Sequence, residues 1–120
     1  MIIHDDSILL NKARTEKTGL QPLQIGAGWS VVWNNFMNVN PLTLPEDAFE
    51  WVHFSEDMAY FIHTEQEIEI DLGWYGGLDK NGWYAVSLHI GKKIKDIFSS
   101  RNIDNITDVI NYFLSYPEQF

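Results

Sequence analysis

Apolar and aromatic runs in the first half of the chain predict a series of β-strands. The stretch 29–36 is rich in β-branched and aromatic residues, follows two nearby glycines and stops shortly before an Asn-Pro pair, which predicts a strand. Two further runs, 49–54 and 58–63, flank the short polar segment 55–57. Because short polar side chains favour tight turns, these two runs are expected to form a hairpin.

The clearest alternation begins at residue 65. From 65 to 71 every second position is acidic, and the intervening positions are a glutamine followed by isoleucines. The tetrapeptide 79–82, Asp-Lys-Asn-Gly, is a strong turn signal, and the run 83–90 returns as the next strand. Side chains of a strand alternate between its two faces, so one face of this hairpin is expected to be acidic and wet.

After this hairpin the period changes to that of a helix. Between 94 and 98 apolar residues recur three and four positions apart, and a longer apolar stripe covers 106–114. Asp104 is the expected N-cap of that last helix, and Pro117 closes it. The pattern predicts an α+β fold: an antiparallel β-meander of about five strands with a C-terminal amphipathic helix packed on one face.

Length and composition fit one folded unit. The 120 residues are 45% apolar and 21% charged, which predicts a single domain over 1–120. Residues 1–28 lack a sustained period and are expected to be a loosely ordered lead-in. The acidic start of the chain and the lack of a long apolar run predict no signal peptide and no membrane span, hence a cytoplasmic protein.

Charge is unevenly distributed along the chain. Lys and Arg are absent from positions 18–79, whereas the same positions contain ten acidic residues. The rest of the chain has eight basic and seven acidic residues, so the formal net charge of -9 arises within the predicted sheet. An acidic protein of this kind is not expected to bind nucleic acid or anionic lipid directly, but it suits a cationic partner.

The acidic face of the predicted hairpin has two readings. It is either an edge strand kept from aggregating by its charges, or a ridge that docks on a basic surface. Trp74 and Tyr75 directly follow the ridge, and aromatic anchors beside carboxylates are typical of strong interfaces, although Trp74 suits the core equally well. The predicted partner-binding residues are Glu56, Asp57, Glu65, Glu67, Glu69, Asp71, Trp74, Tyr75 and Asp79.

No residue pattern predicts catalysis, a metal or a cofactor. There is no Cys, the His residues have no ligand spacing, and the acids of the ridge lie in equivalent solvated positions that give no acid and base pair. The glycines around residue 27 match neither a dinucleotide fingerprint nor a phosphate loop. The protein is therefore not expected to be an enzyme.

The segment 68–114 resembles immunity proteins that accompany bacterial polymorphic toxins, including those of contact-dependent growth inhibition. The resemblance lies in the strand 68–75, the turn 79–82, the strand after it, and the Arg-Asn-Ile-Asp sequence at 101–104 that opens the last helix. It implies a cytoplasmic bacterial protein that binds one cognate toxin domain and neutralises it.

The charge map makes this expectation more specific. RNases and DNases hold phosphates in basic clefts, so the acidic face is expected to bind the C-terminal domain of such a toxin, either within the cleft or beside it. One alternative is a binding module for a small ligand or carbohydrate, with the five Trp residues as an aromatic platform. Another is a mimic of nucleic acid with a different target.

Overall fold

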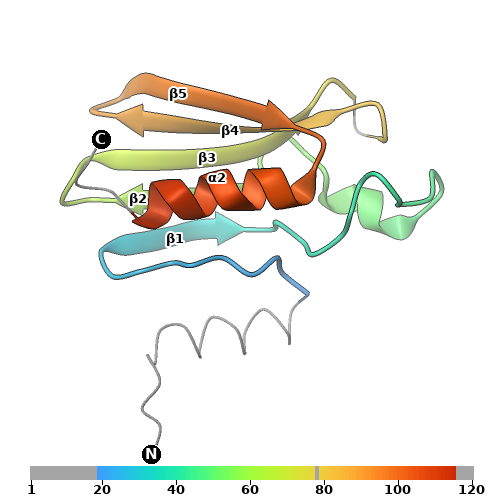
Figure 1. The fold of residues 1–120 in the computed structure, drawn as a ribbon, viewed down its shortest axis with the longest axis horizontal. Coiled ribbons are helices and arrows are strands. Elements are labelled where there is room, and N and C mark those ends of the chain that lie inside the picture. Colours follow the sequence, from blue (N-terminus) through green and yellow to red (C-terminus); the bar gives the residue numbers. More distant parts are fainter. Residues whose placement is uncertain (1–18, 78, 116–120) are drawn as a thin grey trace, which may run out of the picture.

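The computed structural model describes residues 19–77 and 79–115. Five antiparallel strands form one open sheet in the order of the sequence, and a helix packs on one face (Figure 1). The elements are β1 (Trp29–Asn34), the 3-10 helix η1 (Phe49–His53), β2 (Ala59–His63), β3 (Ile68–Tyr75), β4 (Trp83–Ile90), β5 (Lys93–Ser100) and α2 (Ile103–Ser115). The predicted α+β meander with a C-terminal helix is confirmed.

The hydrophobic core lies between α2 and the sheet face that it covers, which we call the inner face. On β3, alternate residues Ile68, Ile70 and Leu72 are almost fully buried, as strand periodicity requires. Ile106 and Ile110 of α2 are completely buried against this face. The opposite face, here called the outer face, is not covered by any described helix or strand.

The predicted strand 49–54 is wrong, because this segment forms η1. The chain between β1 and β2 contains two prolines, whose missing N–H groups do not suit a strand ladder. Trp51 and Phe54 are buried three residues apart, and the Trp51 indole donates a 2.7 Å hydrogen bond to the carbonyl of Pro45. β1 pairs with β2 in the place of the predicted strand.

The helical period predicted for 94–98 is also wrong, since this segment lies in β5. Gly91 and Lys92 both have positive φ, 56° and 70°, and close a two-residue turn that returns the chain along β4. As an edge strand β5 is mostly exposed, and only Phe98 packs against the core. Its apolar residues therefore followed no clean two-residue period.

The last helix forms over Ile103–Ser115, but a different residue caps it, and Pro117, which is predicted to close it, lies outside the described residues. The Asn102 side-chain oxygen accepts the backbone N–H groups of Asp104 and Asn105, at 2.8 and 3.1 Å. Asp104 itself lies in the first turn, where a negative charge favours the helix dipole.

The lead-in predicted for 1–28 is only partly testable, since residues 1–18 lie outside the described residues. Residues 19–28 form no strand but are held in place. Leu23 is buried, the Gln24 N–H donates to the Asn111 side chain at 2.8 Å, and the Gln21 N–H donates to the Phe36 carbonyl at 2.8 Å. This part of the predicted loose segment is therefore fixed against α2 and the chain after β1.

Candidate functional site

The outer face carries the most distinctive group of side chains. Strand register places Tyr60 of β2 opposite Asp71 of β3, and Ser87 of β4 opposite Asp71 on its other side. Two residues earlier on β3, Glu69 lies between Ile62 of β2 and His89 of β4. Each of these residues alternates with buried neighbours, so all of them point away from α2.

A second group of acids reaches this face from the segment before β2. The Ser55 carbonyl accepts the Trp74 N–H at 2.8 Å, so residues 55–57 run beside the end of β3. A Cβ on Gly73 would lie 2.3 Å from the Glu56 carbonyl oxygen, which shows how closely this segment crosses the sheet. The Tyr75 hydroxyl donates to the same carbonyl at 3.5 Å. Glycine at 73 therefore allows the acidic segment to pack onto the outer face.

Asp71 is the least compensated carboxylate of this group. Its Oδ1 is buried without a hydrogen-bond partner among the described residues. Burial, followed by the negative charges of Asp57 and Glu69, raises the pKa of Asp71, and nearby His89 acts in the opposite direction. The ionised carboxylate is thus held in a partly dry and negatively charged place.

Two tyrosines lie next to Asp71, and the same negative charges contribute to raising their pKa values. Burial and the hydrogen bond and charge of Glu69 raise the pKa of Tyr60 to about 12. Burial and the charges of Asp71, Glu56 and Asp57 raise the pKa of Tyr75. We call the set of acids and tyrosines on the outer face the acidic-aromatic face. It consists of Glu56, Asp57, Tyr60, Glu69, Asp71 and Tyr75.

Five of the nine predicted partner-binding residues belong to this face: Glu56, Asp57, Glu69, Asp71 and Tyr75. The predicted ridge is shorter than expected, because β3 begins only at Ile68. Glu65 and Glu67 lie in the β2–β3 turn, and Glu67 has a positive φ of 55°. A turn residue does not follow strand alternation, so these two acids do not continue the row of Glu69 and Asp71.

Asp79 and Trp74 serve a structural role at the end of the β3–β4 hairpin. Trp74 is only 1% exposed, and its indole N–H donates to the Asp79 carbonyl at 3.0 Å. The Asp79 side chain accepts the Asn81 N–H at 2.9 Å and thereby forms the predicted turn. The interface role predicted for Trp74 is therefore wrong, because the alternation of β3 continues through Gly73 and places this ring, like Ile70 and Leu72, on the inner face.

The five Trp residues do not form the aromatic platform that a carbohydrate module requires. Trp51 and Trp74 are core residues in contact at 6.1 Å between ring centroids. Trp29 donates its indole N–H to the Leu114 carbonyl at 2.9 Å. Trp33 and Trp83 are 42% and 41% exposed but belong to β1 and β4, with β2 and β3 between them.

Sequence reasoning missed Tyr60 as a member of the site. Its outward direction follows from the alternation of β2, but its position beside Asp71 depends on the register between β2 and β3. That register is set by the four-residue turn 64–67, which the sequence pattern assigned partly to the strand. Trp33 packs against Tyr60 at 4.9 Å and extends the aromatic surface towards the β1 edge.

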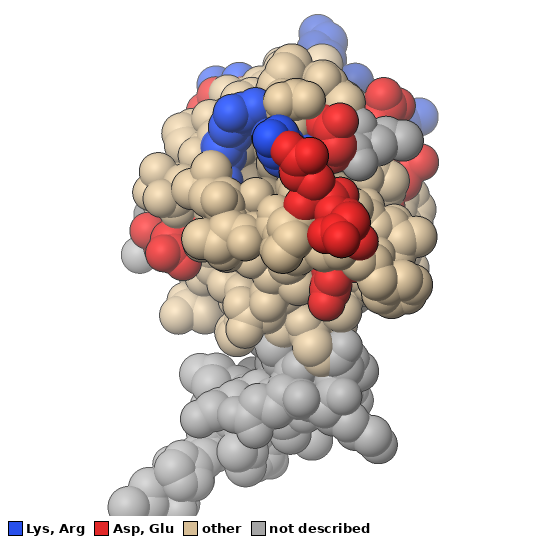
Figure 2. All heavy atoms as spheres, turned by 90° about the vertical axis from the view of Figure 1, so that its right-hand side faces the viewer, with Lys and Arg blue, Asp and Glu red and all other residues tan. Residues whose placement is uncertain are grey.

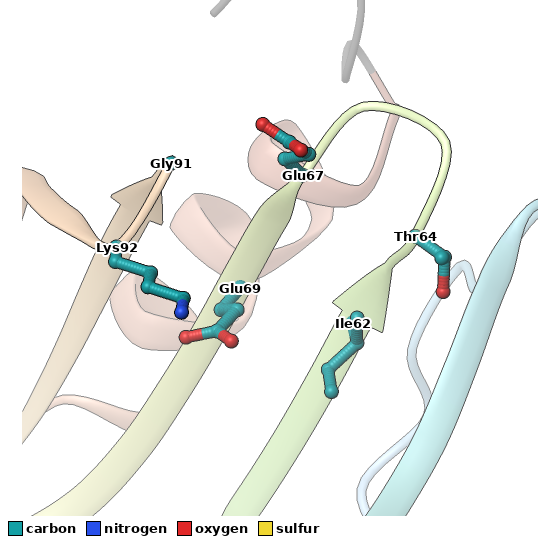
Figure 3. A pocket seen from close by; sticks show the side chains of 6 residues that line it. All are labelled: Ile62, Thr64, Glu67, Glu69, Gly91 and Lys92. Atoms are coloured by element: carbon teal, nitrogen blue, oxygen red, sulfur yellow. The ribbon is translucent and has the colours of Figure 1, made fainter.

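A hollow of about 340 Å³ lies at the opposite end of the outer face, beside the β2–β3 and β4–β5 turns. Figure 3 shows the Lys92 ammonium and the Glu69 carboxylate turned towards each other, whereas Glu67 points away. The turns are joined by a 3.0 Å hydrogen bond from the Gly91 N–H to the Glu67 carbonyl. The residues that line the hollow are Ile62, Thr64, Glu67, Glu69, Gly91 and Lys92.

Two further properties of the described residues bear on function. They contain no group of three or more His, Asp or Glu side chains placed to hold a metal ion. Within the same ranges, every helix is too short or too polar to cross a bilayer.

Comparisons of the chain with protein-family models, with curated proteins and with solved structures found no significant match.

Proposed function

We propose that this protein is an immunity protein that binds a cognate bacterial toxin domain and blocks it through the acidic-aromatic face. The observation that carries the proposal is the combination on this face of Asp71, whose buried Oδ1 has no hydrogen-bond partner among the described residues, with further carboxylates and half-buried tyrosines. Rings supply contact area and carboxylates supply steering and register, which is the composition of strong protein interfaces.

Charge complementarity defines the partner. β1, β2 and β3 contain no Lys or Arg, and His89 of β4 is the one neighbour that lowers the pKa of Asp71 among those that act on it. A Lys or Arg from a partner would supply the missing counter-charge to Asp71 and its acidic neighbours. Nuclease domains present such side chains in their substrate clefts, because they hold phosphates there. An RNase or DNase domain is therefore the proposed target, and occupation of its cleft is the proposed mechanism.

A second copy of this chain suits the face poorly. β3 is the middle strand of five, so a symmetric pair stacked through the centre of the outer face would bring β3 onto β3. Glu69 and Asp71 of one copy would then face the same carboxylates of the other. Like charges in close apposition oppose association, which leaves a basic partner as the better occupant.

The cellular setting follows from the same proposal. A protein that protects a bacterium from a nuclease acts where the nucleic acid is, which is the cytoplasm. The acidic-aromatic face lies on β2, β3 and the segment before β2, so it would cover a cleft with a rigid sheet and would not need to fold on its target. The protein itself carries out no reaction in this mechanism.

The test is co-expression with the C-terminal domain encoded by the adjacent upstream toxin gene. Growth together with a one-to-one complex is the expected result, and the isolated complex should lack nuclease activity. The double variant Glu69→Gln/Asp71→Asn should weaken the complex at least tenfold, whereas Asp108→Asn on the exposed side of α2 should leave it unchanged. Toxicity without a complex would remove the proposal, and equal affinity of both variants would remove the assigned face.

A further inference from the structure

The 3-10 helix η1 presents two apolar side chains to solvent. Residues three apart lie above one another in a 3-10 helix, so Phe49 and Val52 share one side. They are 78% and 65% exposed, whereas Trp51 on the other side is 8% exposed. Adjoining exposed apolar side chains mark interaction surfaces, and Phe49 and Val52 form a small patch of this kind. We call Phe49 and Val52 the η1 knob.

Core contacts of Trp51 fix the position of η1 and therefore of the knob. Trp51 packs against the rings of Phe54 and Trp74, with centroids 4.9 and 6.1 Å away, and is hydrogen-bonded to Pro45. His53 contacts the Phe49 ring edge-on at 6.3 Å. Since the element is fixed by the core, burying Phe49 in a partner would cost little ordering of the backbone.

Acidic residues flank the knob in the sequence. Glu46, Asp47 and Glu50 belong to the same segment, and all three are exposed. Figure 2 looks onto the end of the molecule that carries η1 and the β3–β4 connection, where acidic side chains form a continuous band. Lys80 forms an ion pair with Glu46. Exposed ion pairs of this kind contribute little to stability.

The chain connects this end directly to the outer face. Residues 55–57 leave η1 and pass over Gly73, where Glu56 and Asp57 join the acidic-aromatic face. Residues 54–58 thus join the knob to the outer face along the chain. The knob adds apolar side chains that are more exposed than Trp33 and Trp83, the half-exposed aromatics of β1 and β4.

We infer that Phe49, supported by Val52, is the apolar anchor of the complex and enters an apolar pocket rimmed by Lys or Arg on the toxin domain. This inference rests on the proposed function, and it deepens it by naming a second contact of the same partner. An aromatic side chain buried in such a pocket, within a ring of weaker polar contacts, is the usual arrangement of an energetic hot spot.

The experiment compares Phe49→Ser and Val52→Ser with Tyr112→Ser, which removes an exposed aromatic from α2. Binding to the co-expressed toxin domain is followed by surface plasmon resonance at several salt concentrations. Phe49→Ser should accelerate dissociation at least tenfold and Val52→Ser by a smaller factor, with the salt dependence of association unchanged. Tyr112→Ser should bind as the parent does. All three should keep the parent's unfolding midpoint, because the replaced groups are exposed.

The outcomes distinguish the proposed function from the inference that Phe49 is the apolar anchor. A complex that is weakened by Glu69→Gln/Asp71→Asn but not by Phe49→Ser would overturn the inference and leave the proposed function standing. A complex weakened by Phe49→Ser alone would support the knob and remove the acidic-aromatic face as the main site. If no complex forms, the proposed function fails and the inference fails with it. Self-association that Phe49→Ser abolishes would overturn the inference in favour of a second copy as the occupant.

Discussion

At the scale of single residues, Asp71 is a carboxylate that folding does not favour. It lies between Tyr60 and Ser87 across the sheet, with Oδ1 buried and without a partner among the described residues. Its pKa is raised by burial and by the neighbouring acids. A residue that costs stability and faces an open surface is well explained by a role in binding, since a partner's cation would relieve it.

Asp71→Asn should therefore stabilise the isolated protein at neutral pH. A raised pKa means that the folded state favours the protonated carboxyl. This preference stabilises the folded protein fully at pH values below 3.8, the ordinary pKa of Asp. The stabilisation is lost as the pH rises through the folded-state pKa of Asp71. At pH 7 the free energy of unfolding of the variant should exceed that of the parent by at most about 1 kcal/mol, because solvent screens a half-exposed group. Near pH 3 the two values should be equal.

Chemical denaturation at the two pH values measures this difference, with Asp108→Asn as the control for removal of an exposed carboxylate. A parent that is more stable than Asp71→Asn at pH 7 would show that a favourable interaction of Asp71 outweighs its burial. The same variant should bind the toxin domain less tightly, so that stability and binding change in opposite directions.

At the scale of elements, the sequence pattern predicted those with a long apolar run or stripe, including the largely exposed edge strand β1, and missed those that depend on turns. β1, β4 and α2 have runs or stripes of apolar residues long enough to mark them. β5 did not, because as an exposed edge it buries only Phe98, and its strand conformation follows from the turn at Gly91 and Lys92. η1 was taken for a strand because a short apolar run does not distinguish the two.

The candidate site shows the same division. The acids of β3 could be predicted from alternation, and their exposure follows from the buried isoleucines between them. The membership of Tyr60 could not, since it depends on register, and Glu56 was predicted as a contact residue without the close packing over Gly73 that brings it onto this face. Contacts between strands are fixed by turns and close packing, which one-dimensional periodicity does not describe.

The cap of α2 gives a prediction for an element. Asn102→Ala removes the acceptor of two backbone N–H groups and should lower the free energy of unfolding by about 1 kcal/mol. Asp104→Ala removes only a favourable charge in the first turn and should cost less, about 0.3 to 1 kcal/mol. Urea denaturation of the two variants provides the comparison, and a larger loss for Asp104→Ala would return the cap to that residue.

At the scale of the whole molecule, acidic and basic residues are concentrated in different segments, so the charge distribution of the protein is asymmetric. Positions 18–79 carry all of the excess acid, whereas β5 and the turn before it contain three of the eight basic residues. The acidic segments form the outer face and the η1 end, so a basic partner would be drawn to these surfaces before it makes contact.

The association rate with the toxin domain should accordingly fall as salt is added. Between about 50 and 500 mM NaCl we expect a decrease of at least tenfold, since steering between exposed charges is screened, while dissociation changes far less. Stopped-flow fluorescence of the complex measures both rates. An association rate that is flat over this range would indicate an interface dominated by apolar contacts such as the η1 knob.

The one-sided core has an evolutionary consequence. All of the large fully buried side chains serve the inner face or the cluster that anchors η1, so exchanges on the outer face leave the packing of the domain intact. Under the proposed function, recognition would diverge between lineages through exposed positions of the outer face and the η1 knob while the scaffold is inherited unchanged. A lineage that met a new toxin would then alter these surfaces and leave the core as it is.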